Sequence, residues 1–170
     1  MNTALAARAC VGLVFLFAAL SKVCGAAAWR RFQDATARLS GDGRRRFTGW
    51  LARAVVAAEF AVLILVIGPA TATVGLALAG ALTVGFTAAT LLARARGTAG
   101  TCACFGGRSE PPWWSTVLRN SFLVAAAALG LVGSADGIPQ ATGSALAAGF
   151  AAAALIVGLD RVVSAPERLV

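Results

Sequence analysis

The chain has 170 residues, of which 59% are hydrophobic and 13% are charged, against about 25% charged residues in an average soluble domain. Fifteen basic and seven acidic residues give a net charge of +8, and there is no histidine. This composition cannot supply the polar surface of a soluble domain, and it is too apolar for a disordered chain. Without histidine, a His-ligated haem, a His-bearing zinc site and Ser–His or Cys–His catalysis are excluded. The composition therefore predicts a polytopic membrane protein.

Five apolar segments have about the 17–25 residues that a helix needs to cross the hydrocarbon core of a bilayer. In chain order they are residues 10–28, 51–68, 72–93, 115–132 and 141–159. Gly68 and Pro69 separate the second from the third, which predicts a tight helical hairpin. The expected fold is all-α: a membrane helical bundle forming a single integral membrane domain over residues 1–170. It has a four-helix core and a fifth, C-terminal span.

The segment between the first two spans is different in character. Trp29, Phe32 and Leu39 are spaced at roughly helical intervals, with arginines between them, and a basic turn follows at residues 41–46. This pattern predicts a short amphipathic helix that lies in the membrane interface. A solvated loop with positive charges is the alternative.

The arginines are distributed unevenly between the two faces of the membrane. With five spans, thirteen of the fourteen arginines share one face, and only Arg8 lies opposite. The thirteen are Arg30, Arg31, Arg38, Arg44, Arg45, Arg46, Arg53, Arg94, Arg96, Arg108, Arg119, Arg161 and Arg168. The positive-inside rule then predicts a multi-pass protein of the cell membrane with this face in the cytoplasm. Because the basic charge is explained by topology, no nucleic-acid binding is inferred.

Cys102 and Cys104 are the main candidates for chemistry. One residue separates them in a glycine-rich polar loop between the third and fourth spans, on the predicted cytoplasmic face. Such a pair can form a small, strained disulfide that is easily reduced, and nearby Arg96 and Arg108 would favour a thiolate. The pattern therefore favours a redox-active dithiol, with a metal site or cysteines without chemistry as alternatives.

The other two cysteines have different positions. Cys24 ends the first span on the same face as the pair and is a candidate resolving thiol, whereas Cys10 is expected to be a small buried apolar residue. Their fourteen-residue separation is ~21 Å along a helix, so the two cannot join one metal site. We assign no metal ligands.

Two ionisable residues, Lys22 and Glu59, fall inside apolar spans, where charge is costly without a partner or a polar cavity. A contact between them would fix the register of adjacent helices; a proton or quinone role for Glu59 is the alternative. Arg119 and Asn120 open the fourth span directly after the cysteine loop, where they could hold the loop or stabilise a thiolate.

These features together resemble the MauE family of integral membrane proteins, within the wider DoxX-like group. The matching elements are Ser21-Lys22, Glu59, Cys102-Ala103-Cys104-Phe105-Gly106 and Arg119-Asn120, within about residues 5–133. The resemblance implies a four-helix membrane core, thiol–disulfide chemistry and a thioredoxin-fold partner. The family is associated with methylamine utilisation and with maturation of methylamine dehydrogenase outside the cytoplasm. That location conflicts with a cytoplasmic cysteine loop unless the topology is inverted, electrons cross the membrane, or the partner is cytoplasmic.

The leading hypothesis is a thiol–disulfide redox protein of the lipid bilayer that exchanges electrons with a thioredoxin-fold protein through Cys102 and Cys104. Cys24 is a third candidate catalytic thiol. Lys22, Glu59, Phe105, Gly106, Arg119 and Asn120 are supporting residues. A quinone between the helices near Glu59 is a candidate cofactor. The alternative is a non-catalytic membrane assembly factor or scaffold for a partner enzyme, and a solute transporter built on Lys22 and Glu59 is a third hypothesis.

Overall fold

The computed structural model describes residues 2–40, 45–97, 113–135 and 143–163, and these ranges are entirely helical apart from short turns. The helices are α1 (Asn2–Val23), α2 (Ala26–Ser40), α3 (Arg45–Ile67), α4 (Ala72–Ala95), α5 (Trp113–Ala135) and α6 (Gly143–Val163). The all-α prediction is confirmed. Within the described ranges, four helices are long and apolar enough to cross a membrane, namely α1, α3, α4 and α5. The apolar stretch of α6, Gly143–Gly158, is shorter, so its role as a fifth span stays a prediction.

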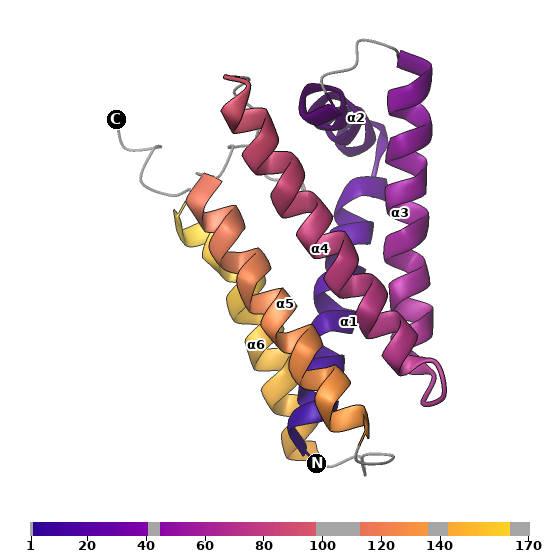
Figure 1. The fold of residues 1–170 in the computed structure, drawn as a ribbon, viewed down its shortest axis with the longest axis vertical. Coiled ribbons are helices and arrows are strands. Elements are labelled where there is room, and N and C mark those ends of the chain that lie inside the picture. Colours follow the sequence, from indigo (N-terminus) through magenta and orange to yellow (C-terminus); the bar gives the residue numbers. More distant parts are fainter. Residues whose placement is uncertain (1, 41–44, 98–112, 136–142, 164–170) are drawn as a thin grey trace.

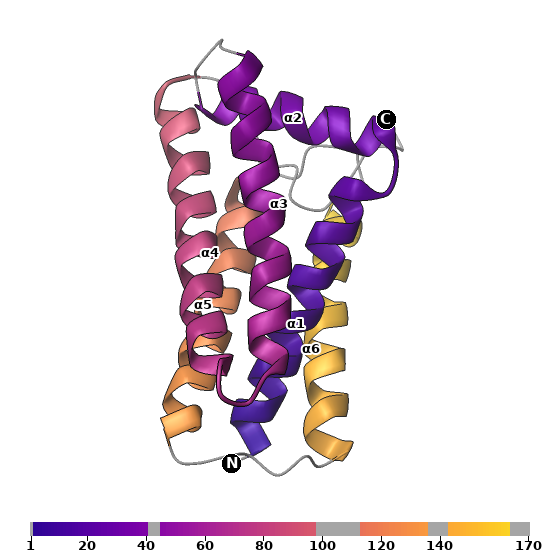
Figure 2. The same ribbon diagram turned by 90° about the vertical axis from the view of Figure 1, so that its right-hand side faces the viewer.

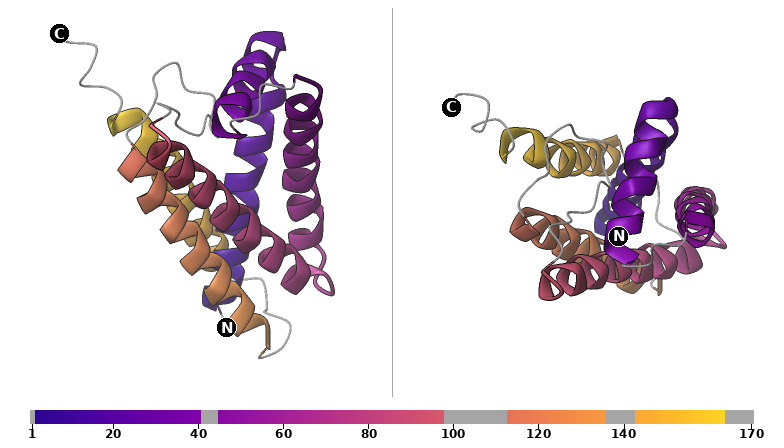
Figure 3. Two further views of the ribbon diagram at one scale, coloured as in Figure 1. Left: turned by 45° about the horizontal axis from the view of Figure 1, so that its top comes forward. Right: turned by 90° about the horizontal axis from the view of Figure 1, so that it is seen from above.

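Helix α1 is the centre of the assembly (Figure 1). It packs against α3 and α5, while α4 packs against both α3 and α5, so that these four helices close a bundle. Helix α6 packs against α1 on the side away from α3 (Figure 3). This is the predicted four-helix core with one additional C-terminal helix.

The apolar core lies mainly in the half of the bundle that contains the N-terminus. Its central cluster draws side chains from α1, α3, α4 and α5: Val11, Phe15, Val62, Val66, Leu76, Ala79 and Ala127. A second cluster joins α1 and α5 to α6 through Cys10, Val14, Leu123, Ala153 and Ile156. Where α6 crosses α1, a Cβ on Gly149 would lie 2.7 Å from the carbonyl oxygen of Ala6. Small residues therefore let these two helices approach closely.

The first helix ends earlier than the sequence analysis predicts. It stops at Val23, not near residue 28, because Gly25 adopts φ 110°, which L side chains rarely adopt. The next helix begins directly afterwards at Ala26, so residues 26–28 belong to α2. Sequence hydropathy alone does not reveal this break, because the alanines after Gly25 are as apolar as those before it.

The predicted hairpin between the second and third spans is confirmed. Helix α3 ends at Ile67 and α4 begins at Ala72, and the turn is closed by the Thr71 hydroxyl, which donates to the carbonyl of Leu65 at 2.8 Å. A Cβ on Gly75 would lie 2.8 Å from the backbone nitrogen of Val66. Glycine at this position permits the close crossing directly after the turn.

The segment after the first span forms a helix, so the alternative of an irregular loop is wrong. Helix α2 lies across one end of the bundle, over the region where α1 ends and α3 begins (Figure 2). Its buried residues are Phe32 and Thr36, and Phe32 packs with Ala52 and Val56 of α3. Part of its apolar side is thus covered by protein.

Candidate functional site

A buried ion pair joins α1 to α3 below α2. Lys22 Nζ lies 2.6 Å from Glu59 Oε1, and the two side chains are 0% and 1% exposed. Lys22 is the last basic residue of α1, and Glu59 lies in the middle of α3. The structure therefore brings together the two ionisable residues that the sequence analysis singled out within spans.

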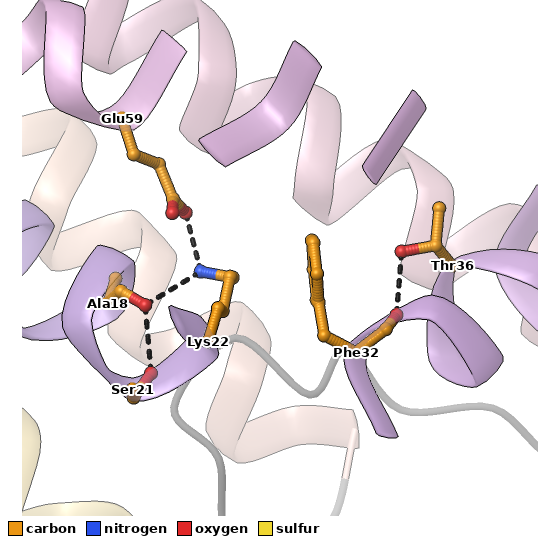
Figure 4. A network of polar contacts seen from close by, with 6 residues as sticks. All are labelled: Ala18, Ser21, Lys22, Phe32, Thr36 and Glu59. Atoms are coloured by element: carbon orange, nitrogen blue, oxygen red, sulfur yellow. Dashed lines mark hydrogen bonds and ion pairs between the residues drawn. The ribbon is translucent and has the colours of Figure 1, made fainter. Parts of the chain in front are cut away.

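Two further groups surround the ammonium of Lys22 (Figure 4). Nζ donates a second hydrogen bond to the carbonyl oxygen of Ala18 at 3.1 Å, one turn earlier in α1. The Phe32 ring of α2 lies with its centroid 5.2 Å from Nζ, within the range of a cation–π contact. Helix α2 thus covers the charge with an aromatic face, a role for Phe32 that the sequence analysis missed.

Helix α5 contributes the second part of the site. Arg119 and Asn120 are 2% and 4% exposed, and Thr116, one turn before them, is fully buried. Arg119 lies close enough to Lys22 for their charges to interact. The amide nitrogen of Asn120 donates to the Thr87 hydroxyl of α4 at 2.9 Å. The Arg-Asn pair that opens the fourth span therefore faces the bundle interior.

Helix α4 presents threonines to this region. Thr83 and Thr90 are buried, and Thr87 lies between them on the same side. Each hydroxyl donates to the backbone carbonyl four residues earlier, and the Thr87 hydroxyl also accepts the hydrogen bond from Asn120 of α5. Their spacing of four and three residues within an apolar span is a helical pattern that could have identified them from the sequence.

We define the polar cluster as Lys22, Glu59, Thr83, Thr87, Thr90, Thr116, Arg119 and Asn120. Among its buried oxygen atoms, Glu59 Oε2 and Thr116 Oγ1 have no hydrogen-bond partner in the described part of the chain. A buried carboxylate oxygen and a buried hydroxyl without partners are unusual, since such groups nearly always find one. The Glu59 carboxylate can therefore accept one further hydrogen bond, and the Thr116 hydroxyl can donate or accept one.

Comparison with known proteins shows which family the chain belongs to. The family model described as methylamine utilisation protein MauE matches residues 1–133. The chain belongs to the MauE family. No curated protein and no solved structure matches it. The MauE match spans α1 to α4 and nearly all of α5, so it includes the whole polar cluster, whereas α6 lies beyond it.

The most specific MauE-like element, Cys102 and Cys104 with Phe105 and Gly106, lies outside the described residues. The helices on either side of it are described. Arg94, near the end of α4, stacks over the ring of Trp113, the first residue of α5, at 4.5 Å. This contact joins the two helix ends between which the cysteine segment runs in the sequence.

The remaining cysteines have contrasting environments. Cys24 follows the last residue of α1 and is exposed, at the end of the bundle that carries α2. Cys10 is buried among apolar side chains of α1, α5 and α6, which confirms the prediction of a small buried residue. Neither forms a disulfide with a cysteine that the structure describes.

The predicted segregation of the arginines agrees with the fold where their helices are described. Those of α2, the first turns of α3, the end of α4 and the start of α5 lie toward the same end of the bundle. Arg8 lies toward the other end and donates to the carbonyl of Val66, near the end of α3, at 2.9 Å. The chain is thus a multi-pass membrane protein of the MauE family, and most of the arginines on its described helices lie toward one end of the bundle.

Proposed function

We propose that this MauE-family protein is a thiol–disulfide redox protein that exchanges electrons with a thioredoxin-fold partner through Cys102 and Cys104. The observation that carries the proposal is the position of the polar cluster. Its cationic members Lys22 and Arg119 lie toward the end of the bundle where α4 ends and α5 begins, the two helices that flank the cysteine pair. Buried cations near a dithiol would stabilise its thiolate, the reactive form.

The exchange needs only sulfur chemistry. In the direction that reduces the partner, a thiolate of the pair attacks the partner's disulfide, expels one partner sulfur as a thiolate and forms a mixed disulfide. The second thiolate of the pair attacks this bond, so that the partner leaves as a dithiol and Cys102 and Cys104 remain as a disulfide. Two electrons and two protons pass to the partner. The opposite direction uses the same steps in reverse.

Supporting roles follow from position. Arg119 supplies positive charge in the second turn of α5, and Asn120 anchors that turn to α4 through Thr87. Gly106 would let the partner's backbone approach the pair closely, and Phe105 beside it is proposed as a supporting residue. Exposed Cys24 is proposed as an additional resolving thiol on the same end.

A membrane quinone is proposed as the group that exchanges two electrons with the cysteines in turn. The polar cluster fits a quinone headgroup in one respect: the buried Thr116 hydroxyl lacks a partner among the described residues and can donate to a carbonyl oxygen. Glu59 Oε2, likewise without a partner there, can hold a proton. These two groups are the ones that would orient such a headgroup.

We propose that the cysteine end faces the cytoplasm, because most of the arginines lie toward that end and the positive-inside rule favours this orientation. The family's description refers to methylamine utilisation, and we propose assistance to a disulfide-rich enzyme of that process as the physiological setting. This setting requires the electrons to cross the membrane if the enzyme is matured outside the cytoplasm.

The test is thiol trapping in intact cells. Cys102→Ser and Cys104→Ser are each expected to abolish turnover, and one of them is expected to accumulate a mixed disulfide with the partner, because the resolving thiol is missing. Cys10→Ser is the matched control and should trap nothing, since Cys10 is buried in the apolar core. Labelling with a membrane-impermeant maleimide, with and without reduction, reports the sidedness and the oxidation state of the pair.

Full function of a Cys102→Ser/Cys104→Ser double variant that still co-purifies with its partner would contradict the proposal. It would establish the alternative, a non-catalytic assembly factor.

A further inference from the structure

One face of α3 carries exposed residues from its first turn to its last, with partly buried Phe60 and Ala61 between them. Arg46, Trp50 and Arg53 lie on it, separated by four and three residues, and all three are exposed, Trp50 by 72%. The same face continues through exposed Ala57 to Ile64, which is 70% exposed. The opposite face carries the buried residues Ala52, Glu59 and Val62, among others. The exposed face therefore looks away from the bundle, toward lipid.

This face changes character along the helix. It starts with two arginines and a tryptophan within ~10 Å of helix length, and it is purely apolar from Ala57 onward. Arginine and tryptophan prefer the headgroup region of a bilayer, whereas alanine and isoleucine are compatible with its acyl chains. Each Cα–Cβ bond of a helix tilts toward the N-terminus, so the Arg53 side chain leads back toward the basic end. The order of residues matches the order of groups in one phospholipid molecule.

The charges nearby favour an anionic headgroup. The described acidic side chains are those of Asp34 and Glu59, and Glu59 is buried against Lys22. On the neighbouring helix α2, Arg30 and Arg31 are exposed as well. The described part of this end therefore has a surplus of outward-facing cations.

We propose that Arg46, Trp50 and Arg53 bind the headgroup of an anionic phospholipid, whose acyl chain lies along Ala57 and Ile64. The two guanidinium groups bind the headgroup phosphate through charge-assisted hydrogen bonds, and in an anionic phospholipid such as phosphatidylglycerol no headgroup cation offsets the charge of that phosphate. The Trp50 ring marks the boundary between headgroups and acyl chains. An acidic protein would also match the two arginines, but it would not account for the apolar continuation of the same face.

The experiment measures which lipid the protein retains. The full chain is incorporated into nanodiscs of equimolar phosphatidylglycerol and phosphatidylcholine with identical acyl chains, extracted in mild detergent, and its bound lipid is quantified by mass spectrometry. The wild type is expected to retain phosphatidylglycerol preferentially, and rising salt should weaken the preference. Arg53→Gln should lower the ratio of the two lipids by about fivefold, whereas Arg53→Lys should keep most of the preference.

The matched control is Arg96→Gln, which removes the same charge from the same end of the bundle, but from an exposed position after α4. It should leave the ratio close to that of the wild type. Equal retention of both lipids by the wild type, an unchanged ratio in Arg53→Gln, or equal losses in both variants would overturn the proposal. Binding of an acidic protein through Arg46 and Arg53 with no lipid preference would overturn it too.

Discussion

Removing one member of the Lys22–Glu59 pair is expected to destabilise the bundle strongly. In Glu59→Met, the ammonium of Lys22 loses its carboxylate partner, while its contacts with the carbonyl of Ala18 and the ring of Phe32 are kept. At the observed 2.6 Å, the direct attraction between the two charges is about 6 kcal/mol for an effective dielectric constant of about 20. The net loss is expected to be about 3–5 kcal/mol, because the remaining buried charge loses its partner without regaining hydration.

The double variant Lys22→Met/Glu59→Met distinguishes the stability lost by leaving one buried charge unpaired from the stability that the ion pair itself contributes. It replaces both charges with flexible apolar side chains and leaves no uncompensated charge, so it should be more stable than either single variant and close to the wild type. In a double-mutant cycle this appears as a coupling energy of several kcal/mol between the two positions.

The buried thiol of Cys10 can be used to measure unfolding. It is buried between α1, α5 and α6, so a thiol-reactive dye reaches it only when the bundle opens. Thermal unfolding in detergent is followed by dye labelling in a background where Cys24, Cys102 and Cys104 are serine. The single variants should melt roughly 6–20 °C below the parent. Ser121→Ala is the control, since that exposed hydroxyl donates to the carbonyl of Val117 in its own helix. Single variants as stable as the parent, or a double variant less stable than both, would refute the reasoning.

Three further variants test the packing, each followed by the same melting assay. Gly149→Val should cost about 1–3 kcal/mol and detach α6, because its Cβ would lie 2.7 Å from the Ala6 carbonyl oxygen; unchanged protease resistance of α6 would contradict the close packing. Asn120→Ala should cost about 1 kcal/mol through loss of the hydrogen bond to Thr87, and no cost in a Thr87→Ala background identifies that bond as the cause. Gly25→Ala should cost about 1–2 kcal/mol from its positive φ alone, since nothing lies within 4 Å of its Cβ position.

The class of fold follows from composition and the lengths of the apolar segments, because a membrane helix must satisfy its own backbone and be long enough to span. The turn at Gly68 and Pro69 is equally local, and its position was predicted. The end of α1 was not predicted correctly, because it depends on the backbone conformation of Gly25, in a stretch where hydropathy does not change. Boundaries of this kind are set by geometry rather than by composition.

The candidate site was predictable in part, for a similar reason. Charged residues in a span are conspicuous, so Lys22, Glu59 and Arg119 could be selected from the sequence alone. The contact of the Phe32 ring with the Lys22 ammonium could not be predicted, since it depends on how α2 crosses the end of the bundle. For Cys102 and Cys104 the sequence remains the sole basis, because they lie outside the described residues.

The distribution of polar residues bears on why the cluster exists. The apolar cluster of Val11, Phe15 and their neighbours already joins α1, α3, α4 and α5 in one half of the bundle. Buried charges are a costly way to repeat that task in the other half, and well-packed apolar residues would do it as well or better. If Lys22→Met/Glu59→Met restores stability but thiol exchange remains impaired, the pair is retained for chemistry at the cysteine end. If exchange recovers together with stability, the pair serves only to set the register of α1 against α3, and the redox proposal then depends on the cysteines and Arg119 alone.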